Sequence, residues 1–150
     1  MIKTDGTSTK YISVFSLLSL FRFWIGGCEN NEIVNISKTV HNEGIRYYVN
    51  SKKTFSGIVE LKHKNDKVSG RTSYKNGILN GPCLTWYDNG QKESEVNFKD
   101  GEFEGLYSQW HRNGQRFSER LYKNGELIES SEKFWNNKGK PVSSITEAFK

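Results

Sequence analysis

Short runs of aromatic and β-branched residues alternate with Asn-Gly and Asp-Gly pairs through the second half of the chain. The run Cys83-Leu84-Thr85-Trp86-Tyr87 has a composition typical of a β-strand. Asn-Gly and Asp-Gly favour two-residue hairpin turns, because such turns need positive φ at both central residues. The pattern therefore predicts strands joined by tight turns. The expected turns are Asn76-Gly77, Asp100-Gly101, Asn124-Gly125, Asn89-Gly90 and Asn113-Gly114.

The same pattern recurs every 24 residues between Tyr74 and Val142. A fixed period of this size is the mark of a repeat architecture in which neighbouring units bury each other's apolar faces. Each unit is one β-hairpin, so the prediction is an all-β fold, an antiparallel hairpin meander of about six to eight strands. The period also predicts two aromatic columns. They contain Trp86, Trp110 and Phe134, and Tyr74, Phe98 and Tyr122.

Less regular segments flank the two clearest units. The segment before them has Lys62 in the Trp column and Asp66 in the Gly90 column, and the segment after them has Gly139 one residue late. Divergent terminal units are expected, since they cap such a stack. Ile45–Val49 and Gly57–Leu61 are predicted to be strands that open the sheet.

The motif Tyr-Lys-Asn-Gly-x-x-x-Gly, followed by an aromatic pair and Asn-Gly-Gln, resembles the variant MORN repeat of bacterial proteins. The match covers Tyr74 to about Gly139. Many proteins with this repeat are described as YwqK-type antitoxin components. The resemblance implies a sheet that binds a protein partner, with a toxin or effector as the expected class of partner.

The charge distribution argues against nucleic-acid binding. The chain has a net charge of +5, but Tyr74 to Val142 contains ten Lys/Arg and ten Asp/Glu, and the basic excess lies before Ser73. A nucleic-acid interface would place a basic stripe on the repeated sheet itself. We therefore expect no nucleic-acid partner.

The N-terminal segment resembles the signal peptide of a bacterial lipoprotein. Lys3 and Lys10 precede the apolar run Ile12–Phe21, which is too short to span a bilayer, and Ile25-Gly26-Gly27-Cys28 resembles a lipobox. The resemblance implies cleavage after residue 27, acylation of Cys28 and a location at the bacterial cell envelope. Because Arg22 interrupts the apolar region, an uncleaved membrane-proximal helix and a buried N-terminal helix remain as alternatives.

The predicted organisation is a short N-terminal hydrophobic or signal segment (1–27), a polar tether (28–43), the repeat domain (44–142) and a C-terminal tail (143–150). The tether would let the domain stand off a membrane. If Cys28 is acylated, Cys83 has no cysteine partner, and the competing possibility is a Cys28–Cys83 disulfide. The tail is expected to form a brief helix or to be disordered.

No catalytic arrangement stands out in the sequence. The three histidines show no metal-ligand spacing, and His63 and His111 fall in repeat columns, where they are interpreted as variable strand positions. We expect no enzymatic activity, no metal and no cofactor. The predicted function is that of a membrane-anchored binding or scaffold protein that mediates protein–protein interaction. An antitoxin- or immunity-like component is the expected class of such a protein. The alternatives are a glycan- or lipid-headgroup-binding module and a cytoplasmic antitoxin-like protein. The candidate binding surface consists of Tyr87, Tyr107, His111 and Trp135.

Overall fold

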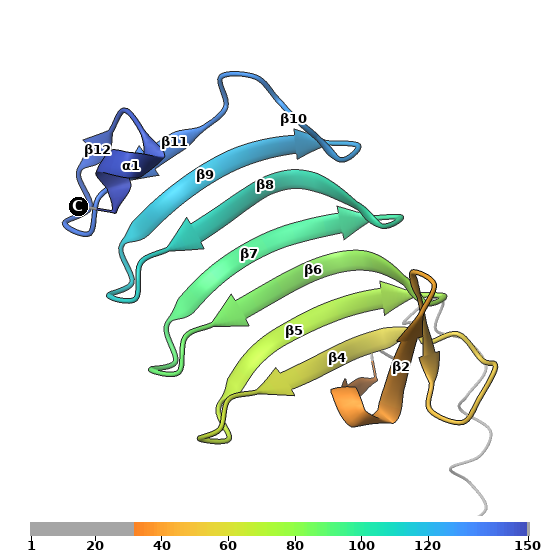
Figure 1. Cartoon of the computed structure of the whole chain (residues 1–150). Coiled ribbons are helices and arrows are strands. Elements are labelled where there is room, and N and C mark those ends of the chain that lie inside the picture. The colour runs from red at the N-terminus through yellow and green to blue at the C-terminus, as the bar shows by residue number, and fades with distance from the viewer. Residues whose placement is uncertain (1–31, 150) are drawn as a thin grey trace, which may run out of the picture.

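The computed structural model describes residues 32–149. The predicted signal segment 1–27 and the predicted lipidation site Cys28 lie outside the described residues. The described part confirms the all-β prediction, because it forms a ten-stranded sheet with antiparallel pairing throughout its long strands (Figure 1). The long strands are β4 (Gly57–Lys62), β5 (Val68–Lys75), β6 (Ile78–Trp86), β7 (Lys92–Lys99), β8 (Glu102–Trp110) and β9 (Arg116–Lys123).

Short strands complete the sheet at both ends. At the N-terminal end, β1 (Ile33–Asn35) pairs with β4 in parallel, which departs from a pure meander. At the C-terminal end lie β10 (Glu126–Leu127), β11 (Lys133–Trp135) and β12 (Pro141–Val142). Together with a separate β2–β3 hairpin they bring the described part to twelve strands. The predicted six to eight was therefore wrong, since strands as short as β1, β2, β10, β11 and β12 show too little pattern in the sequence. The strand predicted at Ile45–Val49 is present as β3, but it belongs to the separate hairpin and does not open the sheet.

The first set of turns is as predicted. Asn76 and Gly77 have φ values of 51° and 84°, and Lys75 pairs directly with Ile78 across the two-residue loop. The equivalent turns at Asp100-Gly101 and Asn124-Gly125 also have positive φ at both residues. These values match the backbone twist that hairpin strands prefer.

The second set of turns differs from the prediction. At Asp88-Asn89-Gly90 only Gly90 has positive φ, 91°, and the loop contains three residues rather than two. Gly90 N donates to the Tyr87 carbonyl at 2.8 Å, and Tyr87 N donates to the Gln91 carbonyl at 2.9 Å. This is a tight turn followed by one left-handed residue, the usual three-residue hairpin loop. Asp66, Gly114 and Gly139 occupy the same left-handed position in the equivalent loops.

Turns of one hairpin are hydrogen-bonded to the next hairpin at both ends of the strands. On one side the turn glycine N–H donates to a carbonyl in the preceding hairpin, at 2.7 to 2.9 Å; the pairs are Gly77–Phe55, Gly101–Leu79 and Gly125–Phe103. On the other side an asparagine amide donates to a carbonyl in the following loop; the pairs are Asn65–Asp88, Asn89–Arg112 and Asn113–Asn137. Fully buried apolar side chains are few among residues 32–149, so these ladders add to the cohesion of a thin sheet.

The N-terminal end of the sheet is covered by a small hairpin. It consists of β2 (Thr39–Asn42) and β3 (Ile45–Tyr48), and a 3-10 turn, η2 (Ile36–Lys38), precedes it. Phe55 is fully buried between this hairpin and the sheet, and it packs with Val34, Val59, Tyr48 and Tyr74. Residues 33–42 therefore belong to the fold. The predicted tether 28–43 was too long, because Val34 and Thr39 bury their side chains despite the polar residues around them.

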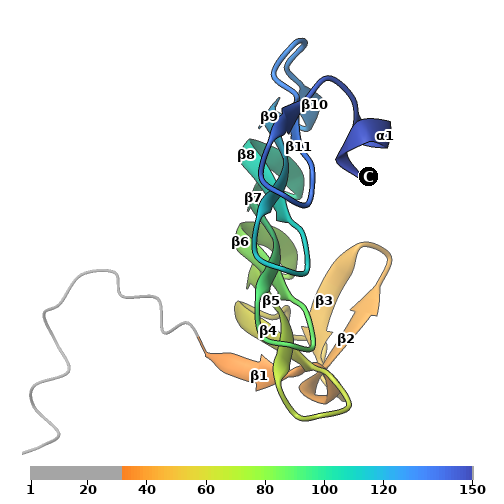
Figure 2. The ribbon, with the colours of Figure 1, turned by 90° about the vertical axis from the view of Figure 1, so that its left-hand side faces the viewer.

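The C-terminal residues 145–148 form the short helix α1 (Ile145–Ala148), capped by the Ser144 side chain. Seen edge-on in Figure 2, α1 and the β2–β3 hairpin stand on the same face of the sheet. We call this the covered face and the opposite one the open face. Within residues 32–149, no helix is both long and apolar enough to cross a lipid bilayer.

Candidate binding face

The open face carries two tryptophans at equivalent positions, Trp86 at the end of β6 and Trp110 at the end of β8. Their strands are separated by β7, so the two rings lie about two strand spacings, or ~9.6 Å, apart. The two tryptophans of the predicted column therefore do not stack directly on each other. Basic side chains from neighbouring strands lie over the rings instead: Arg71 over Trp86 at 5.9 Å, and Lys92 and Arg116 over Trp110 at 5.2 and 5.0 Å.

Each of these basic groups is also paired with a carboxylate. Arg71 lies 2.9 Å from Glu60, Lys92 lies 2.7 Å from Glu95, and Arg116 forms an ion pair with Glu119. The open face therefore presents aromatic rings flanked by neutralised ion pairs, rather than a field of one sign. Exposed pairs of this kind contribute little stability, about 0–1 kcal/mol each. They do hold the guanidinium and ammonium groups in place over the indoles.

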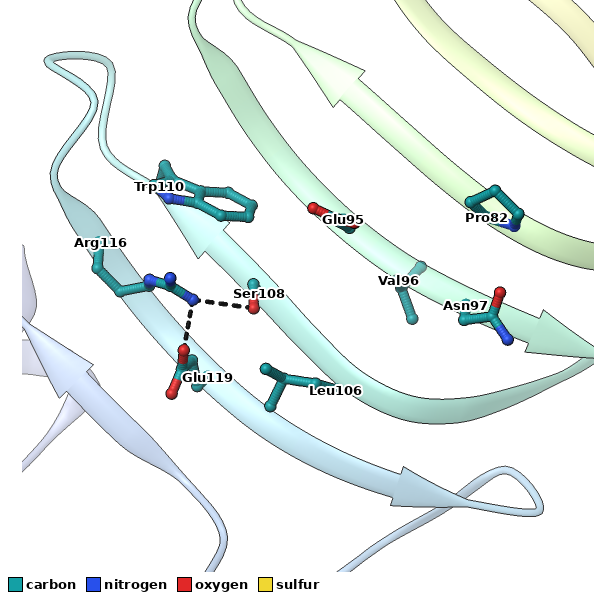
Figure 3. A pocket seen from close by; sticks show the side chains of 9 residues that line it. All are labelled: Pro82, Glu95, Val96, Asn97, Leu106, Ser108, Trp110, Arg116 and Glu119. Carbon is teal, nitrogen blue, oxygen red and sulfur yellow. Dashed lines mark hydrogen bonds and ion pairs between the residues drawn. The ribbon is translucent and has the colours of Figure 1, made fainter.

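A hollow of about 370 Å³ lies in front of Trp110. Figure 3 shows the Arg116 guanidinium between Trp110 and Glu119, with its dashed contacts to Ser108 and Glu119. The opposite wall is more apolar, and its residues are Pro82, Asn97 and Leu106. A similar hollow of about 510 Å³ lies beside Trp86 and Arg71, so the repeat places one hollow at each tryptophan.

Two leucines extend the apolar part of this face. Leu106 and Leu121 pair across β8 and β9, and their side chains are 48% and 42% exposed. Tryptophan and arginine are enriched in protein-binding hot spots, and the exposed leucines enlarge the apolar area beside them. Among residues 32–149, no group of three or more His, Cys, Asp or Glu could hold a metal ion.

The structure brings Tyr87 and His111 of the predicted surface together on the covered face. Both line a hollow of about 250 Å³ with Phe117 and Phe149. The Tyr87 hydroxyl donates to the Trp110 carbonyl at 2.8 Å, and His111 Nε2 lies 2.9 Å from the Trp135 carbonyl. Burial, followed by the nearby Glu93 carboxylate, raises the pKa of Tyr87, and the Arg112 cation opposes that rise. Both side chains therefore connect successive hairpins.

His63 has the same role one repeat earlier. Its Nε2 lies 2.7 Å from the Trp86 carbonyl. The interpretation of His63 and His111 as variable strand positions was wrong, because both stand just after a strand and bind the next hairpin. Since a carbonyl oxygen can only accept, each Nε2 must carry the donated proton.

Tyr107 lies in a different group of aromatic residues. Its ring is stacked with Phe103, centroids 6.0 Å apart, and Phe103 also contacts Phe98 and Tyr122 at 4.9 and 5.1 Å. Phe103 thus fills the space between Phe98 and Tyr122, two members of the predicted column. Burial raises the pKa of the Tyr107 hydroxyl, the Arg120 cation lowers it, and Tyr122 is the next group that raises it.

Trp135, the fourth predicted residue, takes the place that was assigned to Phe134. Its carbonyl accepts from His111, as the Trp110 carbonyl accepts from Tyr87. Phe134 pairs with Ser118 and lies under Arg120, 5.3 Å from the guanidinium carbon to the ring centroid. The step from Trp110 to Trp135 is 25 residues, so one inserted residue shifts the last unit. The late Gly139 was the sign of this shift.

Sequence reasoning missed Leu106, Leu121, Arg116 and Glu119 as residues of one surface. Alternation along β8 and β9 could have found them, because residues two apart on a strand share a face. Trp110 and Leu106 are four apart on β8, and Glu119 and Leu121 are two apart on β9.

Comparison with known proteins identifies two repeats. A family model described as MORN repeat variant matches residues 79–100 and 103–124. Those ranges coincide with the β6–β7 and β8–β9 units that carry the open face. No curated protein and no solved structure gives a significant match. MORN repeats are commonly modules that bind proteins or membranes and are generally not catalytic, which is consistent with a scaffold role for this chain.

Proposed function

We propose that this chain is a scaffold protein that binds a protein partner through the open face of its sheet. The observation that carries the proposal is the row formed by Trp86, Trp110 and the exposed leucines Leu106 and Leu121. No hairpin or helix of the described part stands on that face, whereas α1 and the β2–β3 hairpin occupy the other (Figure 2).

A protein partner fits this face better than a glycan does. Sugar rings bind by stacking on free aromatic surfaces, and two cations already lie over Trp110 at 5.2 and 5.0 Å. Neutral ion pairs around an apolar centre resemble the rim and core of a protein interface. The glycan-binding and lipid-headgroup alternatives therefore have less support on this face.

The proposal includes an anchor at the bacterial cell envelope, with Cys28 acylated and residues 1–27 removed. Its support is the lipobox-like sequence Ile25-Gly26-Gly27-Cys28 after a short apolar run. The partner class follows from the resemblance to YwqK-type antitoxin components: a toxin or effector that acts at the envelope, which the scaffold would restrain in an immunity-like role. A cytoplasmic antitoxin-like protein with an uncleaved N-terminal helix is the alternative.

A matched pair of variants tests the role of the open face. The full chain serves as bait in cells, with Leu106→Lys plus Leu121→Lys as one variant and Leu127→Lys plus Ile145→Lys as the control. All four residues are 40–48% exposed, and both variants gain the same charge. Only the first pair lies on the open face, because Leu127 is paired with Tyr122 and Ile145 belongs to α1 on the covered face. We expect the first variant to retain at least about tenfold less of the co-purifying partner, because hot-spot residues dominate binding.

The identity of the co-purified proteins shows which partner binds. Their loss from one variant and not the other shows which surface they bind. Proteins that both variants retain equally well would contradict binding through the open face. Loss of the same proteins from the Leu127/Ile145 control alone would move the interface to the covered face at the C-terminal end of the sheet.

A further inference from the structure

The chain enters the fold close to the proposed lipid anchor. Strand β1 begins at Ile33, and Glu32 is already hydrogen-bonded, since its carboxylate accepts from the Tyr48 hydroxyl at 2.9 Å. Glu32 follows Cys28 by only four positions, a step that spans at most about 14 Å. An acylated Cys28 would therefore hold the N-terminal end of the sheet near the bilayer surface, and the domain could not stand far off.

That end of the sheet exposes aliphatic side chains. Ile33, Ile36, Val40 and Val49 come from β1, η2, β2 and the residue after β3, and their side chains are 41–54% exposed. A hollow of about 640 Å³ lies among them, lined by Ile33, Tyr48 and Val49. Single exposed aliphatic residues are ordinary on a protein surface. Ile33 and Val49 line this hollow at the point of chain entry, and Ile36 and Val40 are exposed on η2 and β2 of the same end; we call these four residues the apolar patch.

The same end is basic. Residues 32–56, which form this end, contain four Lys/Arg and two Asp/Glu, whereas residues 73–149 contain ten and eleven. Lys38 lines the hollow, and Lys53 lies 5.5 Å from the centre of the Tyr48 ring. Lys38 and Lys52 are exposed and form no ion pair with the described residues. The Glu32 carboxylate at the hollow is engaged by Tyr48.

We propose that this end of the sheet, formed by β1, η2 and the β2–β3 hairpin, rests on a membrane surface rich in anionic phospholipid. The lysines lie against lipid phosphates, and the aliphatic side chains lie at the boundary between headgroups and acyl chains. The strand order then carries the sheet away from the bilayer, from β1 at the surface to β12 at the far end, and presents the open face sideways to a partner. The inference takes its location at a membrane from the proposed anchor, but it can be tested without acylation.

The experiment uses the full chain with Cys28→Ser and compares its binding to phosphatidylcholine vesicles and to mixed phosphatidylcholine–phosphatidylglycerol vesicles. One variant adds Lys38→Glu and Lys52→Glu. The matched control adds Lys123→Glu and Lys138→Glu, which are exposed residues at the other end of the strand order. The apolar run 12–21 is present in every variant, so its contribution to binding cancels.

Each lysine near an anionic surface raises the partition coefficient onto the vesicles about fivefold. We therefore expect the Lys38/Lys52 variant to bind the anionic vesicles at least about tenfold more weakly, and the control to lose about twofold or less. Hydrogen exchange of the bound protein should slow in residues 33–53 and not in residues 133–142. Equal losses in the two variants, or unchanged exchange in residues 33–53, would overturn the proposal.

Two other results test the membrane-binding patch and the acylation of Cys28 separately. If residues 33–53 stay unprotected on vesicles and become protected only in a complex with the captured partner, the patch binds protein and the membrane proposal is wrong. If intact mass shows that Cys28 carries no lipid in cells, the anchor fails, and the vesicle result with the Cys28→Ser chain still decides the patch.

Discussion

At the scale of single residues, the fold depends on side chains that reach the backbone of the next hairpin. The position just after β4, β6 and β8 holds His63, Tyr87 or His111, and each reaches a tryptophan carbonyl 2.7–2.9 Å away. Histidine and tyrosine can both occupy this position, because each side chain carries a hydrogen-bond donor at a similar distance from its own backbone. The repeat therefore fixes the role of this position and leaves the residue type free to vary.

Tyr87→Phe removes one of these side-chain hydrogen bonds and keeps the aromatic ring. We expect a loss of about 0.5–1.5 kcal/mol in the free energy of unfolding, because the Trp110 carbonyl loses its donor. Urea denaturation measures the change. Tyr122→Phe is the control, since the Tyr122 hydroxyl forms no hydrogen bond within residues 32–149, although its ring packs against Phe103. Equal losses of unfolding free energy in the two variants would show that the Tyr87 hydrogen bond does not stabilise the fold.

Alkaline pH should weaken the fold through Tyr87 and Tyr107. Burial raises the pKa of both hydroxyls above the ordinary value of 10.0, so the folded chain holds these protons more tightly than the unfolded chain does. The resulting stability is fully present below pH 10 and falls as the pH rises through the folded pKa values. Denaturation midpoints measured across this range should fall less steeply for the Tyr87→Phe, Tyr107→Phe double variant. A slope unchanged by the substitutions would contradict the assignment.

At the scale of elements, the first set of turns was predictable from the sequence, whereas the second set and the packing of the hairpins were not. The Asn76-Gly77 turn follows from its two residues alone, because few other pairs accept positive φ at both positions. The three-residue loop at Gly90 needed the Tyr87–Gln91 pairing, which sequence does not show. The shift that places Trp135 rather than Phe134 after Trp110 depends on one inserted residue, and short β1 and β2 carry too few residues to reveal their strands.

The same limit applies to the candidate site. Tyr87, Tyr107 and His111 were singled out as free aromatic residues because sequence gives residue type without partners. Their hydrogen bonds and ring contacts come from hairpins 20 or more residues away, or from the facing strand. The open face could have been derived in part from strand alternation, but only after the strands had been placed in register.

Glycines in identical turns should differ in their tolerance of alanine. Gly77, Gly101 and Gly125 have φ values of 84°, 91° and 79°, so alanine pays a similar left-handed penalty of about 1–2 kcal/mol at each. At Gly77 the new Cβ would also meet Ile45 Cγ2 at 2.5 Å and the Arg46 carbonyl at 2.7 Å, whereas its nearest neighbours at Gly101 and Gly125 are 3.5 and 3.6 Å away. Gly77→Ala should therefore cost about 1–3 kcal/mol more than the other two. Equal thermal stability of the three variants would mean that the β2–β3 hairpin does not pack on this turn.

At the scale of the whole molecule, the protein is a stack in which each hairpin contacts its neighbours in the strand order. Such a stack has two different ends and two different faces. One end is basic and apolar, one face is covered by α1 and the β2–β3 hairpin, and the other face carries the tryptophan row. This asymmetry makes the two ends and the two faces of the molecule distinct surfaces, as the proposed binding to a membrane and to a protein partner requires.

The anchor is a prediction at this scale. The protein extracted from membranes should lack residues 1–27 and carry a diacylglyceryl group on Cys28, because two acyl chains hold a protein stably at a bilayer and one chain does not. Intact mass measures both features at once. Cys28→Ser should abolish the added mass and leave uncleaved or mislocalised protein. A wild-type mass with residues 1–27 present and no lipid would favour the cytoplasmic alternative.

The most direct test of partner binding through the open face is photo-crosslinking in living cells. A photoreactive amino acid replaces Leu106 on the open face in one chain and Leu127 at the edge of the sheet in another; the two leucines are 48% and 40% exposed. We predict a discrete adduct with one protein from position 106, absent from position 127 and lost when Trp110 is also replaced by alanine. Adducts of equal yield from both positions, or none from position 106, would contradict binding through this face.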